Sequence, residues 1–175
     1  MNEQDIRSFD DLHRLVNYFY TQAMNDPIIG FFFTQVSPIE LQEHTPKVAR
    51  FWENILFGKS KIPSKKPKTI KKQASDVNSA EKISTDISEN TQIQSQNEPT
   101  IANMLQVHLD LDDKARLQTG HFTRWLYLFI GSIDELYAGE NAERLKKRAK
   151  KMASSLSDAI RSKRGEERVG VDSLK

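Results

Sequence analysis

One histidine lies in the middle of a short apolar segment, ANMLQVHLDL, which spans residues 102–111. This residue, His108, is flanked by Leu105, Val107 and Leu109, so the pattern places it among aliphatic side chains. A buried neutral imidazole needs a partner for its acceptor nitrogen, and that partner is a protein donor, a water molecule or a metal ion. The segment therefore predicts either a histidine satisfied inside a core or a histidine that binds a metal.

Three further polar side chains fall toward apolar helix faces when residues are placed at 100° intervals. Tyr20 lies on the flank of one apolar stripe, His44 lies within another, and Trp125 lies at the edge of a third. Taken singly, such a histidine is more often satisfied by a backbone carbonyl, such a tyrosine has its hydroxyl at the surface, and such a tryptophan is ordinary core. Buried polar groups need partners, however. Together with His108, these side chains predict that something polar lies among them.

Helical periodicity predicts the elements that carry these side chains. Apolar residues recur at helical spacing in four stretches, at about residues 10–25, 37–58, 115–137 and 141–161. The sequence has no convincing strand alternation, hairpin turn signal or internal repeat. An all-α fold is therefore expected. On these helices His121 falls off the core face, and His13 is expected at the surface.

Short polar motifs predict where three of the helices begin. Ser8 with Asp11 gives an acidic start to the first helix. Ser37, followed by a proline and, three residues later, a glutamate, predicts the cap of the second helix. The segment DLDDKARL, residues 110–117, has the acidic residues typical of a helix N-terminus, so its aspartates are expected to begin the next helix.

Composition divides the 175-residue chain into one predicted domain, residues 1–58 and 99–161, interrupted by a low-complexity insertion at 59–98 and followed by a flexible tail at 162–175. The insertion opens with many lysines but no aromatic residue, so we expect a solvated spacer and no specific nucleic-acid binding.

The absence of cysteine excludes disulfides, thiolate metal sites and covalently attached haem. A polar N-terminus and short apolar runs predict a cytoplasmic protein without a transmembrane segment.

Four ordered blocks of the sequence resemble the third group of the truncated haemoglobins. The blocks are LVNYFYTQAMNDPIIGFFF, HTPKVARFWENILFG, VHLDL and HFTRWLYLFIGSIDELYAG, of which HTPKVARFW and HFTRWLYLF are the most specific. The resemblance implies a truncated globin, a two-over-two helical sandwich that holds haem b. The chain departs from the family in its long, disordered insertion before the segment that carries the proximal histidine. Loop-closure entropy grows slowly with length, so such an insertion can be tolerated.

The resemblance also implies roles for individual residues. His108 is similar to the proximal histidine, which binds the haem iron. The positions that match the family's distal ligand-binding side chains are Tyr20, His44 and Trp125. The positions that match haem contacts are Phe33, which packs on the haem face, Val48, Trp125 and Lys47, the last as a partner for a haem propionate.

These roles imply a protein that binds O2, CO or NO at a five-coordinate iron. The resemblance allows oxygen binding, transport or delivery, and also nitric oxide or peroxide detoxification, and leaves open whether the chain is an enzyme. Nitric oxide dioxygenase or peroxidase-like turnover would need an external reductase, because no flavin or dinucleotide motif is present. A monomer is expected.

Two alternatives remain open from the sequence. The first is a haem-free helical module that senses a signal or binds a partner, which would keep the apolar stripes without needing His108. The second is a metal site held by His108 and His121, which has few flanking carboxylates to complete it. A hydrolase is not expected, because no serine or cysteine nucleophile motif is present.

Overall fold

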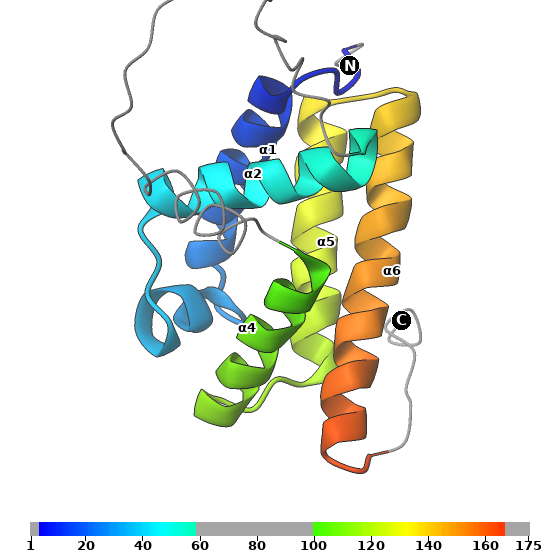
Figure 1. Cartoon of the computed structure of the whole chain (residues 1–175). Helices are drawn as coiled ribbons and strands as arrows, with labels where there is room; N and C mark the ends of the chain where they lie inside the picture. The colour runs from blue at the N-terminus through cyan, green and yellow to red at the C-terminus, as the bar shows by residue number, and fades with distance from the viewer. Residues whose placement is uncertain (1–3, 59–99, 167–175) are drawn as a thin grey trace, which may run out of the picture. The chain divides into compact units, whose positions relative to one another are not determined.

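The regular elements of the chain are all helices in residues 4–58 and 100–166, the part that the computed structural model describes (Figure 1). In chain order they are α1 (Phe9–Met24), the short π-helix η1 (Phe32–Val36), α2 (Leu41–Phe57), α4 (Ile101–Lys114), α5 (Thr119–Leu136) and α6 (Glu140–Lys163). The expected all-α fold is confirmed. The predicted insertion at 59–98 lies outside the described residues, and α6 continues two residues past the predicted end of the domain.

Four long helices form two packed pairs. Helix α1 packs against α2, and α5 packs against α6 (Figure 1). The pairs meet where α1 contacts α5 and α2 contacts α6. This arrangement is the predicted two-over-two sandwich. Helix α4 lies outside the two pairs and packs chiefly against α6.

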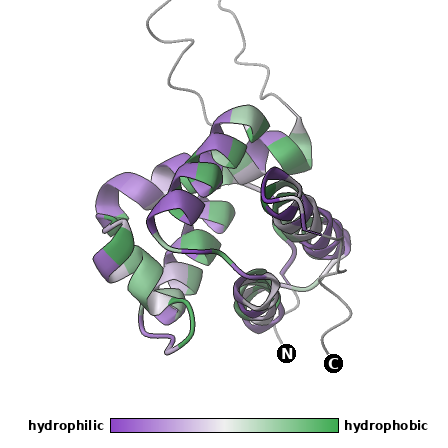
Figure 2. Ribbon diagram, turned by 90° about the horizontal axis from the view of Figure 1, so that it is seen from below, coloured by the Kyte–Doolittle hydropathy of each residue, from purple (hydrophilic) through white to green (hydrophobic). Residues whose placement is uncertain are grey.

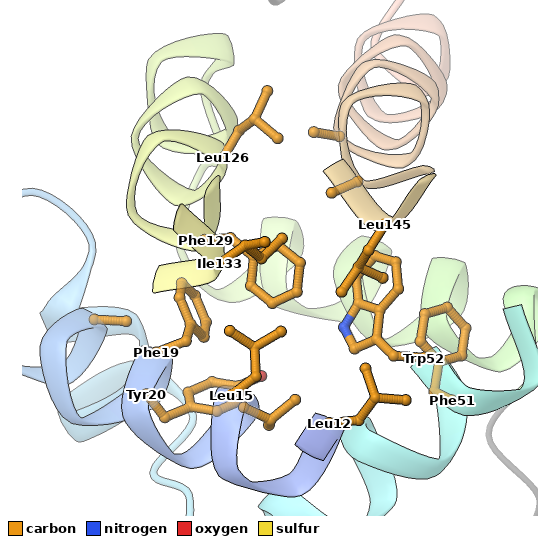
Figure 3. Packing of buried hydrophobic residues seen from close by; sticks show 14 of the residues in the cluster. Leu12, Leu15, Phe19, Tyr20, Phe51, Trp52, Leu126, Phe129, Ile133 and Leu145 are labelled. Carbon is orange, nitrogen blue, oxygen red and sulfur yellow. The ribbon is translucent and has the colours of Figure 1, made fainter. Parts of the chain in front are cut away.

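An aromatic stack at the centre of the core joins three of these helices. The ring of Phe129 on α5 lies between two indoles, with centroid distances of 5.1 Å to Trp52 of α2 and 5.0 Å to Trp125 of α5 itself. Phe19 of α1 meets Phe129 edge-on at 5.3 Å. Figure 3 shows leucine and isoleucine side chains from α1, α5 and α6 around Phe19, Trp52 and Phe129. The apolar stripes that predicted the helices are therefore the surfaces that meet in the core.

The start of α1 agrees with the sequence pattern. The Ser8 side chain accepts a hydrogen bond from the backbone N–H of Asp11, and the Asp11 carboxylate accepts one from the backbone N–H of Ser8. This reciprocal pair satisfies two N–H groups that the first helical turn leaves without intrahelical partners. The end of α2 also agrees with the sequence pattern. Gly58 ends this helix with a φ of 79°, a value that favours glycine.

Two predicted helix starts are wrong. Ser37 does not cap α2: it ends η1, with its N–H donating to the carbonyl of Phe32, whereas Glu40 is the N-cap of α2, which begins at Leu41. The aspartates of residues 110–117 belong to the end of α4 and not to the start of α5, which begins at Thr119. One of them, Asp112, accepts the backbone N–H of Leu117 at 2.7 Å and thereby holds the turn between these two helices.

A buried ion pair holds the turn after α1 against α5. The Asp26 carboxylate accepts backbone N–H groups from Ile28 and Ile29, at 3.0 and 3.1 Å. Arg124 of α5 donates to the same carboxylate through Nε and Nη2, at 2.8 and 2.7 Å. Only 3% of the Asp26 side chain is exposed, against 33% of the Arg124 side chain. Burial opposes ionisation, but these four hydrogen bonds lower the pKa of Asp26 overall.

We expect Asp26→Asn to reduce the free energy of unfolding at pH 7 by about 2 kcal/mol, the scale of hydrogen bonds to a charged group. A lowered pKa stabilises the fold above the pKa of the unfolded carboxyl, and this stability is lost as the pH falls through the folded value. The difference between the native protein and the variant in urea unfolding should therefore shrink as the pH falls below about 4. Asp10→Asn, at an exposed position, is the control and should change stability far less. A pH-independent difference would contradict an electrostatic role for Asp26.

Candidate functional site

Two polar side chains from α1 and α2 meet where these helices cross. The hydroxyl of Tyr20 lies 2.8 Å from Nε2 of His44, and the two rings meet edge-on at 4.9 Å. Phe33 of η1 packs edge-on against Tyr20 at 5.5 Å. The structure thus brings together three of the predicted site residues, which we call the distal cluster (Tyr20, His44 and Phe33).

The polar groups of the distal cluster are neutral near pH 7. Burial raises the pKa of the Tyr20 hydroxyl above its usual range, so the phenol keeps its proton. Burial, and then the charge of Lys47, lower the pKa of His44, so the imidazole is uncharged. A neutral phenol and a neutral imidazole share one hydrogen bond, and the tautomer of His44 decides which of them donates.

Trp125 of α5 approaches the distal cluster through Phe19. The ring of Phe19 meets Trp125 at 5.6 Å and Tyr20 at 5.0 Å, edge-on in both cases. Trp125 is half-buried, and among the described residues its indole N–H has no hydrogen-bond partner. The indole therefore keeps a free donor close to a phenol that is already hydrogen-bonded.

His108 lies on α4 with one nitrogen engaged. Its Nδ1 atom is 2.8 Å from the carbonyl oxygen of Met104, one turn earlier. Because a carbonyl oxygen only accepts, Nδ1 carries the proton and Nε2 keeps its lone pair in the neutral ring. Burial lowers the pKa of His108, and the bond to Met104 offsets this only in part, so the ring is neutral near pH 7. Nε2 has no partner among the described residues.

The helix that carries His108 is apolar but poorly covered. None of the residues of α4 is buried, although several of its apolar side chains are packed in part against the core. Those partly buried side chains are Met104, Leu105, Leu109 and Leu111. Phe122 of α5 lies 6.3 Å from the His108 ring, and Trp125 follows it by one helical turn on the same helix. Helix α5 therefore lies next to His108 through Phe122, and next to Phe19, which contacts the distal cluster, through Trp125.

Comparison with known proteins places this arrangement in a known architecture. No protein-family model and no curated protein matches the chain. A search of solved structures finds the crystal structure of the group III truncated hemoglobin from Campylobacter jejuni, with a TM-score of 0.57. The match covers 90% of this chain and 94% of that chain, at 19% sequence identity. The chain has the truncated-hemoglobin fold.

Within this fold, the structure relates the predicted site residues to one another in different ways. Tyr20, His44 and Phe33 are in direct contact, and Trp125 reaches them through Phe19. Two further predicted residues lie one turn along α2 from His44: Val48 packs in part against the core, and Lys47 is exposed. Among the described residues no hydrogen bond or ring contact is seen between His108 and any of them, and its assignment as an iron ligand stays a prediction.

His13 is not a surface residue, contrary to expectation. It is half-buried beside Phe9, and its Nε2 atom lies 3.2 Å from the hydroxyl of Thr45, the residue that follows His44. The Thr45 hydroxyl donates its only proton to the carbonyl of Leu41, so Nε2 of His13 must donate to Thr45. The contact ties α1 to α2 next to the distal cluster. The sequence does indicate a buried polar contact at this place, because Thr45 lies within the apolar stripe of α2 and needs a hydrogen-bond partner.

His121 has a structural role in this truncated-hemoglobin fold. Its Nδ1 atom accepts the backbone N–H of Gln118 and helps to cap α5, and its ring packs edge-on against Phe32 at 5.0 Å.

The described part of the chain contains no group of three candidate metal ligands. No helix in residues 4–58 and 100–166 is long and apolar enough to cross a membrane.

Proposed function

We propose that the protein binds haem b through Nε2 of His108 and holds a diatomic gas next to the distal cluster. The observation that supports this most directly is the state of His108: a neutral imidazole with Nδ1 engaged by a carbonyl and Nε2 unpartnered. A backbone carbonyl on the second nitrogen is the usual way in which proteins orient a metal-binding histidine. When bound, haem would supply an iron atom with one free coordination position for O2, CO or NO.

The surface of α4 and the predicted haem contacts suit a porphyrin. The apolar face of α4 has no buried residue, so it has apolar surface that a flat hydrophobic group would cover. Phe33, Val48 and Trp125 would supply further apolar and aromatic contacts. Lys47 is exposed and close enough to influence His44, which suits it to pair with a propionate at the edge of the pocket. The chain has no cysteine, so the group would be held without a thioether bond.

The Tyr20–His44 bond would prepare one donor for a ligand. If Nε2–H of His44 donates to the Tyr20 oxygen, the phenol proton is free to donate into the pocket. A donor that itself accepts a hydrogen bond is polarised and donates more strongly. Trp125 would supply the second donor through its free indole N–H. Because burial raises the pKa of the Tyr20 hydroxyl, the phenol would stabilise negative charge on a ligand while keeping its own proton.

This donor arrangement supports ligand binding and retention, in keeping with oxygen binding or delivery. Detoxification of nitric oxide or peroxide would use the same donors but would also need electrons from a separate reductase. Binding is therefore the activity that we propose for the chain itself.

Haem titration of the purified full-length protein tests this proposal. We expect a saturable Soret band at one haem per chain, and a further shift of that band after reduction and addition of CO. A protein that remains without a Soret change through the titration would contradict haem binding. It would favour the alternative of a haem-free helical module, because the fold itself would be unchanged.

A further inference from the structure

A cavity of about 350 Å³ lies where α5 begins and α6 ends. This is the lower end of the molecule in Figure 1, and Figure 2 views the molecule from this end. The residues that line the cavity are Arg116, Gln118, Thr119, Gly120, Arg161, Arg164 and Glu166. None of them belongs to the proposed haem site.

The cavity is rich in positive charge. Three of its lining residues are arginines, and only Glu166 is acidic. The Glu166 carboxylate accepts from Nη2 of Arg116 at 2.6 Å and lies 3.4 Å from Nε of Arg164. A carboxylate therefore already occupies the position between two guanidinium groups, which is where a bound oxyanion would receive hydrogen bonds from both.

Arg164 has donors that the protein does not use fully. Its Nη2 atom donates to the carbonyl of Leu117 at 2.8 Å, which fixes the side chain beside the cavity. Its Nε and Nη1 atoms are buried and have no hydrogen bond among the described residues. The nearby carboxylate oxygens, of Glu166 and Asp112, lie 3.4 and 3.3 Å away. The same Asp112 oxygen also accepts the Leu117 N–H at 2.7 Å, so it is shared between the two groups.

Neutral N–H donors also line the cavity. Helix α5 has 18 residues and begins at Thr119, so the first N–H groups, at Thr119 and Gly120, have no intrahelical acceptor. A Cβ placed on Gly120 would meet nothing within 4 Å, so the backbone there is open to a ligand. Such N–H groups, combined with the positive end of the helix dipole, favour anions.

We propose that this cavity binds a diphosphate group, and that the group displaces the Glu166 carboxylate from Arg116 and Arg164. A volume of about 350 Å³ corresponds to roughly ten water molecules, which is ample for two linked phosphates. A diphosphate has several acceptor oxygens and more than one negative charge, whereas the carboxylate that it replaces has two oxygens and one charge. The proposal does not depend on haem binding, because none of the lining residues is among the predicted haem-site residues.

Isothermal titration of the full-length protein with inorganic pyrophosphate at low ionic strength tests the proposal. We expect saturable binding of one anion per chain. Arg116→Gln should weaken it about tenfold, since it removes one charge-assisted contact. Arg116 is the suitable position because its side chain is 67% exposed and, among the described residues, bonds only to Glu166, so the fold should be unaffected. Glu166→Gln should tighten binding, because it removes the competing carboxylate.

Lys163→Gln is the matched control. Lys163 lies on the last turn of α6, pairs with Asp113 and does not line the cavity, so its loss removes the same charge elsewhere. Binding that falls equally in Lys163→Gln and Arg116→Gln would show attraction to net charge alone and would overturn the proposal. Absence of saturable binding, or no tightening in Glu166→Gln, would also overturn it.

Discussion

The His108→Ala variant should fail to retain haem. The Nε2 atom of His108 is the proposed protein ligand to iron, and no other imidazole on α4 could replace it. Loss of a partner that merely orients a metal ligand costs roughly 10–100-fold in affinity, so loss of the ligand itself should cost at least about a hundredfold. The measurement is a haem titration followed through the Soret band, together with the rate at which haem transfers to a competing apo-globin. The fold should survive, because His108 is only half-buried.

Two further measurements separate coordination from packing in this variant. Imidazole added to the His108→Ala protein should restore the spectrum of the native protein, because a free ring can occupy the vacated space and bind the iron. His121→Asn, which keeps a side-chain acceptor for Gln118, should retain haem with an unaltered spectrum. A His108→Ala protein that keeps its pigment and its spectrum would show that His108 is not the ligand.

The two interpretations of His108 from the sequence prove to be compatible. One interpretation had the imidazole satisfied by a backbone carbonyl, and the other had it bind a metal. The structure engages Nδ1 with the Met104 carbonyl, and Nε2 has no partner among the described residues, so the first interaction would leave the ring free for the proposed second one. A sequence cannot separate the two nitrogens, because their environments depend on the helix that forms around them.

Features fixed by neighbouring residues were predictable from the sequence. The capping box of Ser8 and Asp11 depends on four consecutive residues, and the stripe through Trp125 and Phe129 depends only on helical spacing. Tyr20 was placed toward the interior on the same basis, and it is buried. These predictions hold because the interactions lie within one turn or one face of a helix.

Three features were not predictable from local patterns. Ser37 has the residue type of a cap, but it ends η1, a π-helix that no periodicity in the sequence indicates, and Glu40 is the N-cap of α2. Asp112 was expected to begin a helix, yet it lies in the last turn of α4, where its carboxylate accepts the Leu117 N–H and lies 3.3 Å from Nη1 of Arg164, about fifty residues later. His13 lies off the stripe of α1 and is covered only because α2 crosses there and presents Thr45. For Asp112 and His13, part of the environment comes from a helix far away in the sequence, which a local pattern cannot indicate.

Removal of the Tyr20 hydroxyl should have the second large effect. We expect Tyr20→Phe to accelerate O2 dissociation from the reduced, haem-loaded protein by about 10–100-fold. The physical reason is the loss of one hydrogen bond to a partly charged ligand in a buried site, worth about 1.5–3 kcal/mol, which corresponds to that range of rates at about 1.4 kcal/mol per tenfold change. CO carries less charge when bound, so its dissociation should change much less. Stopped-flow replacement of O2 by CO measures both effects.

Tyr18→Phe makes the same chemical change on the same helix and is the control. Tyr18 is 37% exposed and points away from the distal cluster, so O2 release from this variant should match that of the native protein. His44→Leu tests the coupling between the two polar groups. If His44 donates to Tyr20, its loss should accelerate O2 release by less than the loss of Tyr20, because the phenol proton remains. If Tyr20→Phe releases O2 at the native rate, the phenol does not contact the ligand, and Trp125 would be the donor to remove next.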